Sequence, residues 1–271
     1  MNLIKITYSF IKTCSINKRL IISLVEREIH SRYKGSIFGI FWVLLNPVFL
    51  LLIYTFVFSI VLKTRWDGQI NSTRSFALIL YAGLIVFNFF SECIAKSPSL
   101  ITANVNLVKK VVFPLEILPI VTVGAALFHL TINLFAWFIF YFIFIGLPSV
   151  GSLLFPIIFL PLVFFTLGAI FFISSLGVYL RDINQIIGLL ITMLLFLSPI
   201  FYPISAIPAE YQILLMLNPL TTGIEMSRDV LLMGIMPNVY PYMCYLIFSL
   251  LVFSLGLRWF EKTRIGFADV L

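Results

Sequence analysis

The chain is 271 residues long, 61% hydrophobic and only 11% charged, with a mean hydropathy of +1.11. A soluble domain has roughly 25% charged residues, so the composition excludes a soluble protein and predicts that lipid is the main solvent. Lys and Arg outnumber Asp and Glu by 18 to 11, but their positions follow a membrane topology, as described below. We therefore expect membrane lipid, and no nucleic acid, among the partners.

The N-terminal residues 1–37 contain charges too often to cross a bilayer, but residues 20–33 have the pattern of an amphipathic helix. Its apolar residues recur at helical spacing and are Ile21, Leu24, Val25 and Ile29. We predict a helix that lies in the membrane interface, within a cytoplasmic tail. The basic residues expected to meet anionic lipid there are Arg27, Arg32 and Lys34. The alternative is an ordinary amphipathic helix packed on protein.

Six apolar runs follow, and each is a candidate membrane span. A hydrocarbon core about 30 Å thick takes about 20 helical residues to cross. The runs cover residues 38–62, 76–95, 117–145, 156–180, 186–202 and 242–260. They are continuously apolar rather than alternating, which favours helices over the strands of a barrel. The sequence thus predicts an all-α membrane protein with one domain, 38–260, followed by a short tail, 261–271.

The basic residues orient these spans. If residues 1–37 are cytoplasmic, all but four of the 18 Lys and Arg residues lie in the tails or in the inner loops. The four exceptions are Lys63, Arg65, Arg74 and Arg228. The positive-inside rule therefore places both termini in the cytoplasm, as an even number of spans requires.

Aromatic residues make up 16% of the chain, more than two interface belts would use. Some of them should face a cavity, and sugar rings stack their C–H faces on aromatic side chains. Candidates for the lining of such a passage, from the first and fifth spans, are Phe41, Trp42, Tyr54, Phe58, Phe196, Phe201 and Tyr202. Packing against lipid or neighbouring helices is the alternative for each of them.

Residues 203–237, between the fifth and sixth spans, are neither consistently apolar nor consistently polar. Four prolines divide this segment, at positions 203, 208, 219 and 237. The pieces 209–217 and 221–233 have helical patterns but are too short to span, so we predict two short helices at the outer face or re-entering it. Glu225 and Arg228 are spaced to pair on one helix face, with a cap near Thr221 or Thr222. The alternative is a surface cap with no part in transport.

The sequence lacks the motifs of an enzyme or a metal site. No Lys-Ser or Lys-Thr pair follows a glycine, so no phosphate-binding loop is present, and His30 and His129 are too far apart to suggest a metal site. We expect His129 to be a packing residue, and the pair Glu92 and Lys96 to extend to the inner interface. The chain is therefore predicted to bind no cofactor and no metal, and not to be an enzyme.

Four segments in the same order along the chain carry a family resemblance. They are Glu26–Ser36 running into Phe38–Trp42 and Asn46-Pro47, then Leu107–Glu116, then Tyr179–Ile183, then Leu217–Leu220 with Glu225, Arg228 and Asp229. Together they resemble the ABC-2 type permeases that export O-antigen and teichoic acid. The resemblance implies a homodimer in the bacterial inner membrane that moves a lipid-linked polysaccharide outward. It also implies two separate cytoplasmic ATPase subunits, which carry the ATP and Mg²⁺.

The resemblance further implies roles for individual segments. The loop at about 97–113 corresponds to the coupling helix that docks on the ATPase, through Leu100, Ile101, Val105, Leu107, Lys109 and Lys110. Arg181 and Asp182 correspond to the cytoplasmic mouth, where they would form a gating ion pair or attract a pyrophosphate head group, unless they are simply a solvated pair. Glu225 and Arg228 would belong to an outer gate formed by residues 203–237.

Other classes of function remain as alternatives. An ABC-2 exporter of small lipids or drugs would share the six spans and the dimer. A membrane enzyme acting on polyprenyl-linked sugars would need clustered acids or His residues at one membrane face. A passive channel is the third alternative.

Overall fold

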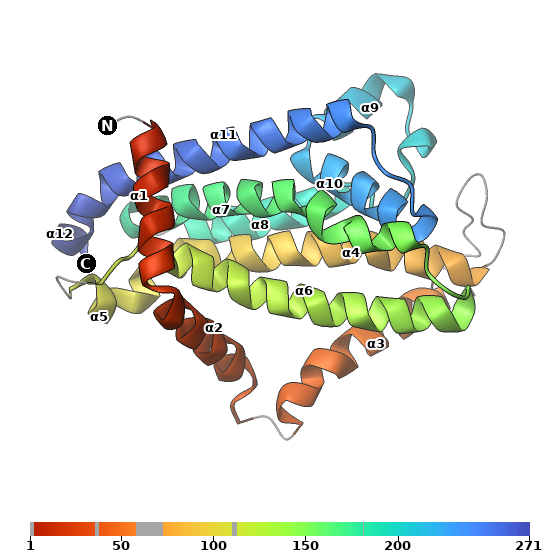
Figure 1. Ribbon diagram of the computed structural model, residues 1–271, viewed down its shortest axis with the longest axis horizontal. Coiled ribbons are helices and arrows are strands. Elements are labelled where there is room, and N and C mark those ends of the chain that lie inside the picture. The colour runs from red at the N-terminus through yellow and green to blue at the C-terminus, as the bar shows by residue number, and fades with distance from the viewer. Residues whose placement is uncertain (1–2, 36–37, 58–72, 110–112, 181) are drawn as a thin grey trace.

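The computed structural model describes residues 3–35, 38–57, 73–109, 113–180 and 182–271, and in these ranges every regular element is a helix (Figure 1). The α-helices are α1 (Leu3–Ile16), α2 (Lys18–Tyr33), α3 (Trp42–Tyr54), α4 (Thr73–Lys96), α5 (Val105–Val108), α6 (Ile117–Phe144), α7 (Phe155–Tyr179), α8 (Ile183–Phe196), α9 (Ala209–Met216), α10 (Pro219–Arg228), α11 (Val239–Thr263) and α12 (Phe267–Val270). A π-helical segment, Asp229–Met233, extends α10. The all-α prediction is confirmed.

Within the part of the chain that the structure describes, four helical stretches are long and apolar enough to cross a membrane. They are Phe76–Ser99, Ile117–Phe144, Val150–Tyr179 and Val239–Val270, which match the second, third, fourth and sixth predicted spans. The first and fifth predicted spans correspond to shorter apolar helices, Leu45–Val57 and Ile183–Phe196. A helix of 14 residues is about 21 Å long, less than the hydrocarbon thickness of about 30 Å. Residues 58–62 of the first predicted span lie outside the described residues, so the count of six remains a prediction.

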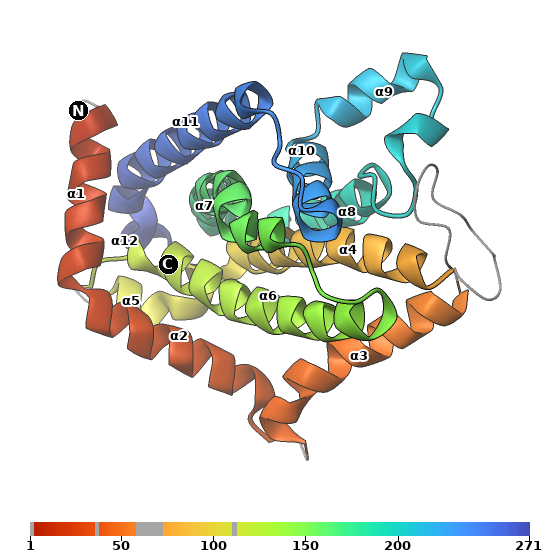
Figure 2. The same cartoon turned by 45° about the vertical axis from the view of Figure 1, so that its right-hand side comes forward.

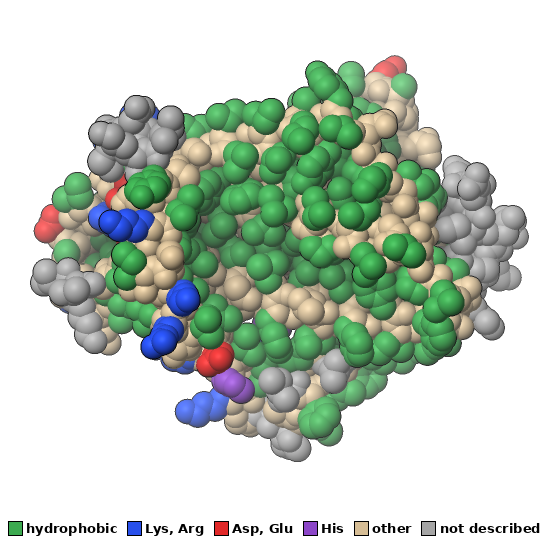
Figure 3. All heavy atoms as spheres, in the orientation of Figure 1, with side chains coloured by type: hydrophobic (Ala, Val, Ile, Leu, Met, Phe, Trp, Pro, Cys, Tyr) green, Lys and Arg blue, Asp and Glu red, His purple; other side chains and the backbone are tan. Residues whose placement is uncertain are grey.

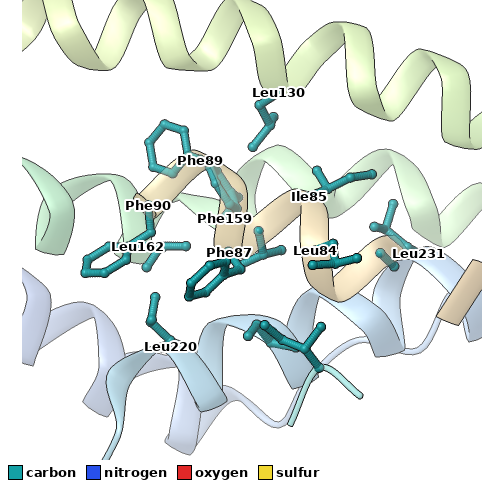
Figure 4. Close-up of a cluster of buried hydrophobic side chains, with 14 of the residues drawn as sticks. Leu84, Ile85, Phe87, Phe89, Phe90, Leu130, Phe159, Leu162, Leu220 and Leu231 are labelled. Atoms are coloured by element: carbon teal, nitrogen blue, oxygen red, sulfur yellow. The ribbon is translucent and has the colours of Figure 1, made fainter. Parts of the chain in front are cut away.

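Helix α4 is the centre of the bundle. Every residue from Phe76 to Phe87 is buried, because α4 contacts α3, α6, α7, α8 and α10. A helix that is apolar on all sides is stable only when other elements cover it completely. Figure 4 shows side chains of α4 between Leu130 of α6, Phe159 and Leu162 of α7, and Leu220 of α10.

The predicted short helices between the fifth and sixth spans are present, with nearly the predicted bounds, as α9 and α10 with its π-helical extension. Helix α10 packs against α4 and α7, and Leu220, Ile224 and Leu231 are completely covered or nearly so. Most of α9, in contrast, is exposed. Helix α10 is thus part of the hydrophobic core and not a surface cap.

Glycines permit the close contact between α7 and α11. A Cβ atom at Gly256 would lie 2.2 Å from the carbonyl oxygen of Gly168, and one at Gly168 would lie 2.6 Å from the backbone nitrogen of Phe253. Small residues at a crossing let two backbones approach each other in a membrane. A Cβ atom at Gly177 would lie 1.9 Å from the carbonyl oxygen of Pro98, so the turn after α4 is packed directly on α7.

The N-terminal helices lie at one end of the bundle, where both chain termini are found (Figures 1 and 2). Helix α1 contacts α11, and α2 packs along α6. The apolar residues of α2 that the sequence assigns to lipid contact protein instead: Leu24 and Val25 pack against Ile117, Val121 and the Gly124 backbone of α6. This finding favours the alternative of an amphipathic helix packed on protein, and a position at the membrane interface remains a prediction for its other face.

We predict that Gly256→Ala lowers the stability of the protein. The added methyl group forces α7 and α11 apart, and overpacking of this kind costs about 1–3 kcal/mol. The matched control is Gly188→Ala on α8, where a Cβ atom would meet nothing within 4 Å. There the better helix propensity of Ala should leave stability unchanged or slightly raised. Thermal unfolding of the detergent-solubilised protein tests this, and equal midpoints for the two variants would contradict the close-contact account.

Candidate functional site

A polar pocket of about 500 Å³ opens between α2, α3, α4 and α6. Its lining includes Arg32, Tyr33, Trp42, Asn46, Asn88, Ser91, Glu92, Lys96, His129 and Asn133. Ionisable groups at such depth among apolar helices are costly and usually mark a functional site. We refer to this site as the polar pocket.

Glu92 of α4 is the centre of the charges in the polar pocket. Its carboxylate pairs with the Arg32 guanidinium of α2 and accepts a hydrogen bond from Nδ1 of His129 on α6, at 2.9 Å. Lys96 Nζ lies 3.7 Å from the same carboxylate and 3.0 Å from Oε1 of Glu28 on α2. Two acids of different helices are thus balanced by cations from α2 and α4. The pairs attach α2 to the bundle formed by α4 and α6.

The imidazole of His129 is fixed by contacts on both nitrogens. Nδ1 faces Glu92, while Nε2 lies 3.2 Å from the Tyr33 hydroxyl. Burial raises the pKa of Tyr33, so its hydroxyl stays protonated and donates a hydrogen bond to Nε2. The arrangement resembles an acid–base relay, but both ring nitrogens already have partners within the protein.

Further hydrogen bonds between α4 and α6 continue toward the other end of the bundle. The Tyr81 hydroxyl of α4 donates to Oδ1 of Asn133 on α6 at 2.6 Å, and Asn133 is held in turn within α6, where its Nδ2 donates to the His129 carbonyl at 2.7 Å. Trp137 Nε1 donates to the Leu78 carbonyl at 2.9 Å. Polar groups inside a membrane bundle are stable when paired in this way, and here the pairs fix α4 against α6.

A second polar cluster lies at the opposite end of α4, around Arg228. Its side chain is 5% exposed, and its guanidinium pairs with Oε1 of Glu225 at 2.8 Å. Nε donates to the Ile79 carbonyl at 3.2 Å, and Nη2 donates to the Pro199 carbonyl at 3.0 Å and faces the Ile200 carbonyl at 3.4 Å. One side chain thus ties α10 to α4 and to the turn that follows α8. We refer to these contacts as the Arg228 clamp.

Local sequence explains how the clamp is built. A Cβ atom at Gly83 would lie 2.7 Å from Nη2 of Arg228, so only glycine leaves room for the guanidinium on α4. The predicted Glu225–Arg228 pair is present. The predicted cap at Thr221 or Thr222 is wrong: Asn218 caps the helix by accepting from the Leu220 nitrogen at 3.0 Å, because Pro219 is well suited to the first turn.

The structure describes residues 97–109 and 113 of the predicted coupling segment, and Lys110 lies outside the described residues. Ile101 is completely buried among residues of this same chain, and Leu100 and Leu107 pack against the same cluster. Ile101 therefore cannot fill a groove on a partner without leaving the core. Lys109 is exposed, and Leu100, Val105 and Leu107 are half-buried, so these four members remain at least partly accessible.

The other predicted site residues do not gather in one site, although Phe196 lies 6.1 Å from Phe201 between ring centroids and its carbonyl accepts a hydrogen bond from the Tyr202 hydroxyl at 2.6 Å. At the predicted mouth, Asp182 is exposed just before α8, and Arg181 lies outside the described residues. Among the predicted lining aromatics, Phe41, Trp42 and Phe196 are exposed and Tyr54, Phe201 and Tyr202 are half-buried, while Phe58 lies outside the described residues. Only Trp42 belongs to the polar pocket. Arg27 and Lys34 are exposed, as the interfacial prediction requires, whereas Arg32 is paired with Glu92.

The sequence analysis missed the polar pocket. It paired Glu92 with Lys96 and treated His129 as packing, whereas the structure joins both acid and imidazole to α2. No spacing rule connects residues 37 or 60 positions apart, so only the packing of α2 and α6 on α4 brings these groups together. Within the described residues no group of three or more His, Cys, Asp and Glu side chains is placed to hold a metal.

Comparison with known proteins gives a consistent set of relatives. A family model described as "ABC-2 type transporter" matches residues 19–232. The O-antigen export system permease protein RfbA of Myxococcus xanthus is 28% identical over 252 residues, which cover 92% of this chain and 94% of that protein. A protein of the same name from Klebsiella pneumoniae is 28% identical over 93% of this chain and 95% of its own length. The polysialic acid transport protein KpsM of Escherichia coli is 25% identical over 92% and 95%.

We predict that Glu92→Gln loosens α2 from the bundle. The change leaves Arg32 and Lys96 without their shared acid and costs about 1–3 kcal/mol, since hydrogen bonds to charged groups are worth more than neutral ones. Glu28→Gln is the control, because it removes only the more exposed pair with Lys96 and should cost less than about 1 kcal/mol. Thermal unfolding and protease cleavage between α2 and α3 measure the effect. A larger loss for Glu28→Gln would sink this account of the pocket.

We predict a larger loss of stability for Arg228→Met. Removing the guanidinium leaves three carbonyl groups and the Glu225 carboxylate without their donor, and breaking a buried pair in this way costs about 3–5 kcal/mol. Glu225→Gln should cost clearly less, because Arg228 keeps its carbonyl partners. The measurement is the free energy of unfolding in detergent. If the two variants lose the same amount, the carbonyl contacts of Arg228 contribute nothing.

Proposed function

Because the chain belongs to the ABC-2 type transporter family, we propose that it is the permease subunit of an ATP-binding-cassette exporter that moves a lipid-linked, O-antigen-like polysaccharide from the cytoplasm across the bacterial inner membrane. The observation that carries this proposal is the extent of the similarity: the relatives named for O-antigen export and for polysialic acid transport match more than nine-tenths of the chain. Both names refer to polysaccharides. This favours a polymer over small lipids or drugs as the cargo.

The physical properties of the chain support the same assignment. The polar pocket combines amide, hydroxyl and charged groups with the exposed ring of Trp42, a mixture that suits a hydroxylated and partly charged cargo. An enzyme that acts on lipid-linked sugars would need an acid or base free to react, whereas Glu92 and both nitrogens of His129 are engaged by neighbouring side chains. We therefore assign the chain a transport role.

We propose six spans with both termini in the cytoplasm. The short helices α3 and α8 would be the first and fifth spans, completed by the residues that flank them. In Figure 3 the Lys and Arg side chains gather over the end that carries α1 and α2, and the rest of that face is largely hydrophobic. The positive-inside rule supports a cytoplasmic position for this end, with α9 and α10 toward the outside. In this orientation α10 is a re-entrant helix, because it packs between α4 and α7.

We propose that two copies of the chain form the channel and that two cytoplasmic ATPase subunits, which bind ATP with Mg²⁺, drive it. Helix α8 offers an uncovered apolar face for the second copy: Ile186, Leu189, Leu190, Met193 and Phe196 are exposed. One small bundle can hardly enclose a polymer, whereas two copies can place a path along their shared axis. The ATPase would dock on residues 97–109.

The contacts of the coupling segment suggest how a movement of the ATPase spreads. Pro98 packs on Gly177 of α7, and Lys96, directly before it, pairs with Glu28 of α2. A displacement of this segment would therefore move both α7 and α2. At the outer end the Arg228 clamp holds α10 on α4, so we assign the gate movement to the exposed helix α9 and the residues before it.

Deleting the gene in its host tests the function. We expect the surface polysaccharide to disappear and the lipid-linked polymer to accumulate in the cytoplasm, with a plasmid copy of the gene restoring export. Electrophoresis of surface polysaccharide, together with extraction of the lipid-linked polymer, measures both effects. An unchanged surface polymer with a defect in the export of small lipids or drugs would refute the proposal.

The docking segment has its own test. Lys109→Glu reverses an exposed charge on the proposed coupling surface and should lower the amount of ATPase that purifies with the tagged permease by about tenfold, a change of about 1.4 kcal/mol. Lys18→Glu makes the same reversal at an exposed position on α2 and should leave the yield unchanged. Equal retention of the ATPase by both variants would show that docking lies elsewhere.

A further inference from the structure

A groove of about 630 Å³ runs between α7 and α11, separate from the polar pocket and from the proposed coupling surface. Gly168 of α7 and Gly256 of α11 line its floor, at the point where the backbones of the two helices come into close contact. Phe172 and Trp259 lie on opposite sides, with ring centroids 5.4 Å apart. The rest of the lining consists of four aliphatic residues, Ala169, Ile173, Val252 and Leu255, and two basic residues. We refer to it as the α7–α11 groove.

The two basic residues stand at one end of this groove. Arg258 and Lys262 are four residues apart on α11, so they lie on the same helix face. Both are exposed, and among the described residues neither takes part in an ion pair, whereas the nearby Arg264 pairs with Glu116 and Glu261. No acidic side chain lines the groove. Its basic end therefore carries two positive charges that this part of the chain does not balance.

The dimensions of the groove fit one lipid chain. From Val252 to Lys262 the helix advances about 15 Å, which is about half of a 30 Å hydrocarbon core. An apolar channel of that length with cations at one end has the form of a single phospholipid in one leaflet. Trp259 lies between Arg258 and Lys262 in sequence, and Trp side chains favour the boundary between head groups and acyl chains.

We propose that the α7–α11 groove binds one anionic phospholipid, with an acyl chain along the glycine floor and the phosphate on Arg258 and Lys262. In the proposed orientation this end faces the cytoplasm, so the lipid comes from the inner leaflet. Basic pockets between spans on the cytoplasmic side bind anionic head groups. A second copy of the chain is a poorer occupant, because two-fold pairing here would bring four cations together with no acid between them. The bound lipid fills the groove beside the α7–α11 crossing.

Native mass spectrometry of the purified full-length protein tests this proposal. The protein is titrated with phosphatidylglycerol or with phosphatidylcholine, and bound lipid is counted per chain. We expect one tightly held phosphatidylglycerol and no matching phosphatidylcholine. The double variant Arg258→Gln/Lys262→Gln should weaken phosphatidylglycerol binding by about tenfold or more, since each basic residue near an anionic surface contributes about 1 kcal/mol.

Two charge controls and one variant that narrows the groove make the result specific. Lys12→Gln/Arg19→Gln removes the same charge from exposed positions on α1 and α2 and should keep the lipid. Arg258→Lys/Lys262→Arg keeps both charges and should also retain it. Ala169→Leu narrows the groove without changing charge and should lose the lipid. Phosphatidylglycerol should raise the unfolding temperature of the wild type and of the two charge controls, but not that of the double Gln variant. Equal binding of both lipids, or unchanged binding by the double Gln variant, would overturn the proposal.

Discussion

The burial of α4 from Phe76 to Phe87 is the constraint on which the rest of this structure depends. Every residue from Phe76 to Phe87 is buried, so five other helices must pack around this one apolar rod. Apolar packing alone does not fix the rotation and height of helices in lipid, because lipid tails are as apolar as the side chains. The polar contacts of α4 supply that specificity. Tyr81 fixes it against α6, and Glu92 fixes it against both α6 and α2.

The two ends of α4 therefore make two different sets of polar contacts. Toward the termini, Glu92 and Lys96 hold the amphipathic helix α2 and precede the turn that packs on α7. Toward the other end, the Ile79 carbonyl and the gap at Gly83 receive Arg228 from α10. Helix α4 thus connects the proposed coupling segment to α10, which contacts the proposed gate helix α9. A rigid helix with two discrete attachments can transmit a movement over its whole length, which an isolated gate helix cannot do.

Much of this architecture is predictable from the sequence, for identifiable reasons. Hydropathy finds the four long spans because each is a continuous apolar run, and prolines divide residues 203–237 at nearly the observed helix ends. Local spacing also predicts the Glu225–Arg228 pair. What sequence cannot supply is contact between distant helices. Three contacts depend on the fold and have no local sequence pattern. They are the ion pairs that link Glu92 to Arg32 and His129, the burial of Ile101 and the packing of Leu24 on α6.

The central claim is that this chain is the path for a polysaccharide, powered by a separate ATPase. The most direct measurement uses inverted vesicles that contain the purified permease and its partner ATPase, with a lipid-linked polysaccharide supplied outside. The account predicts that added ATP moves the glycan into the lumen, where it resists an external glycosidase, and that vesicles without the permease show no such protection. Protection that is independent of ATP, or that appears equally without the permease, would contradict it.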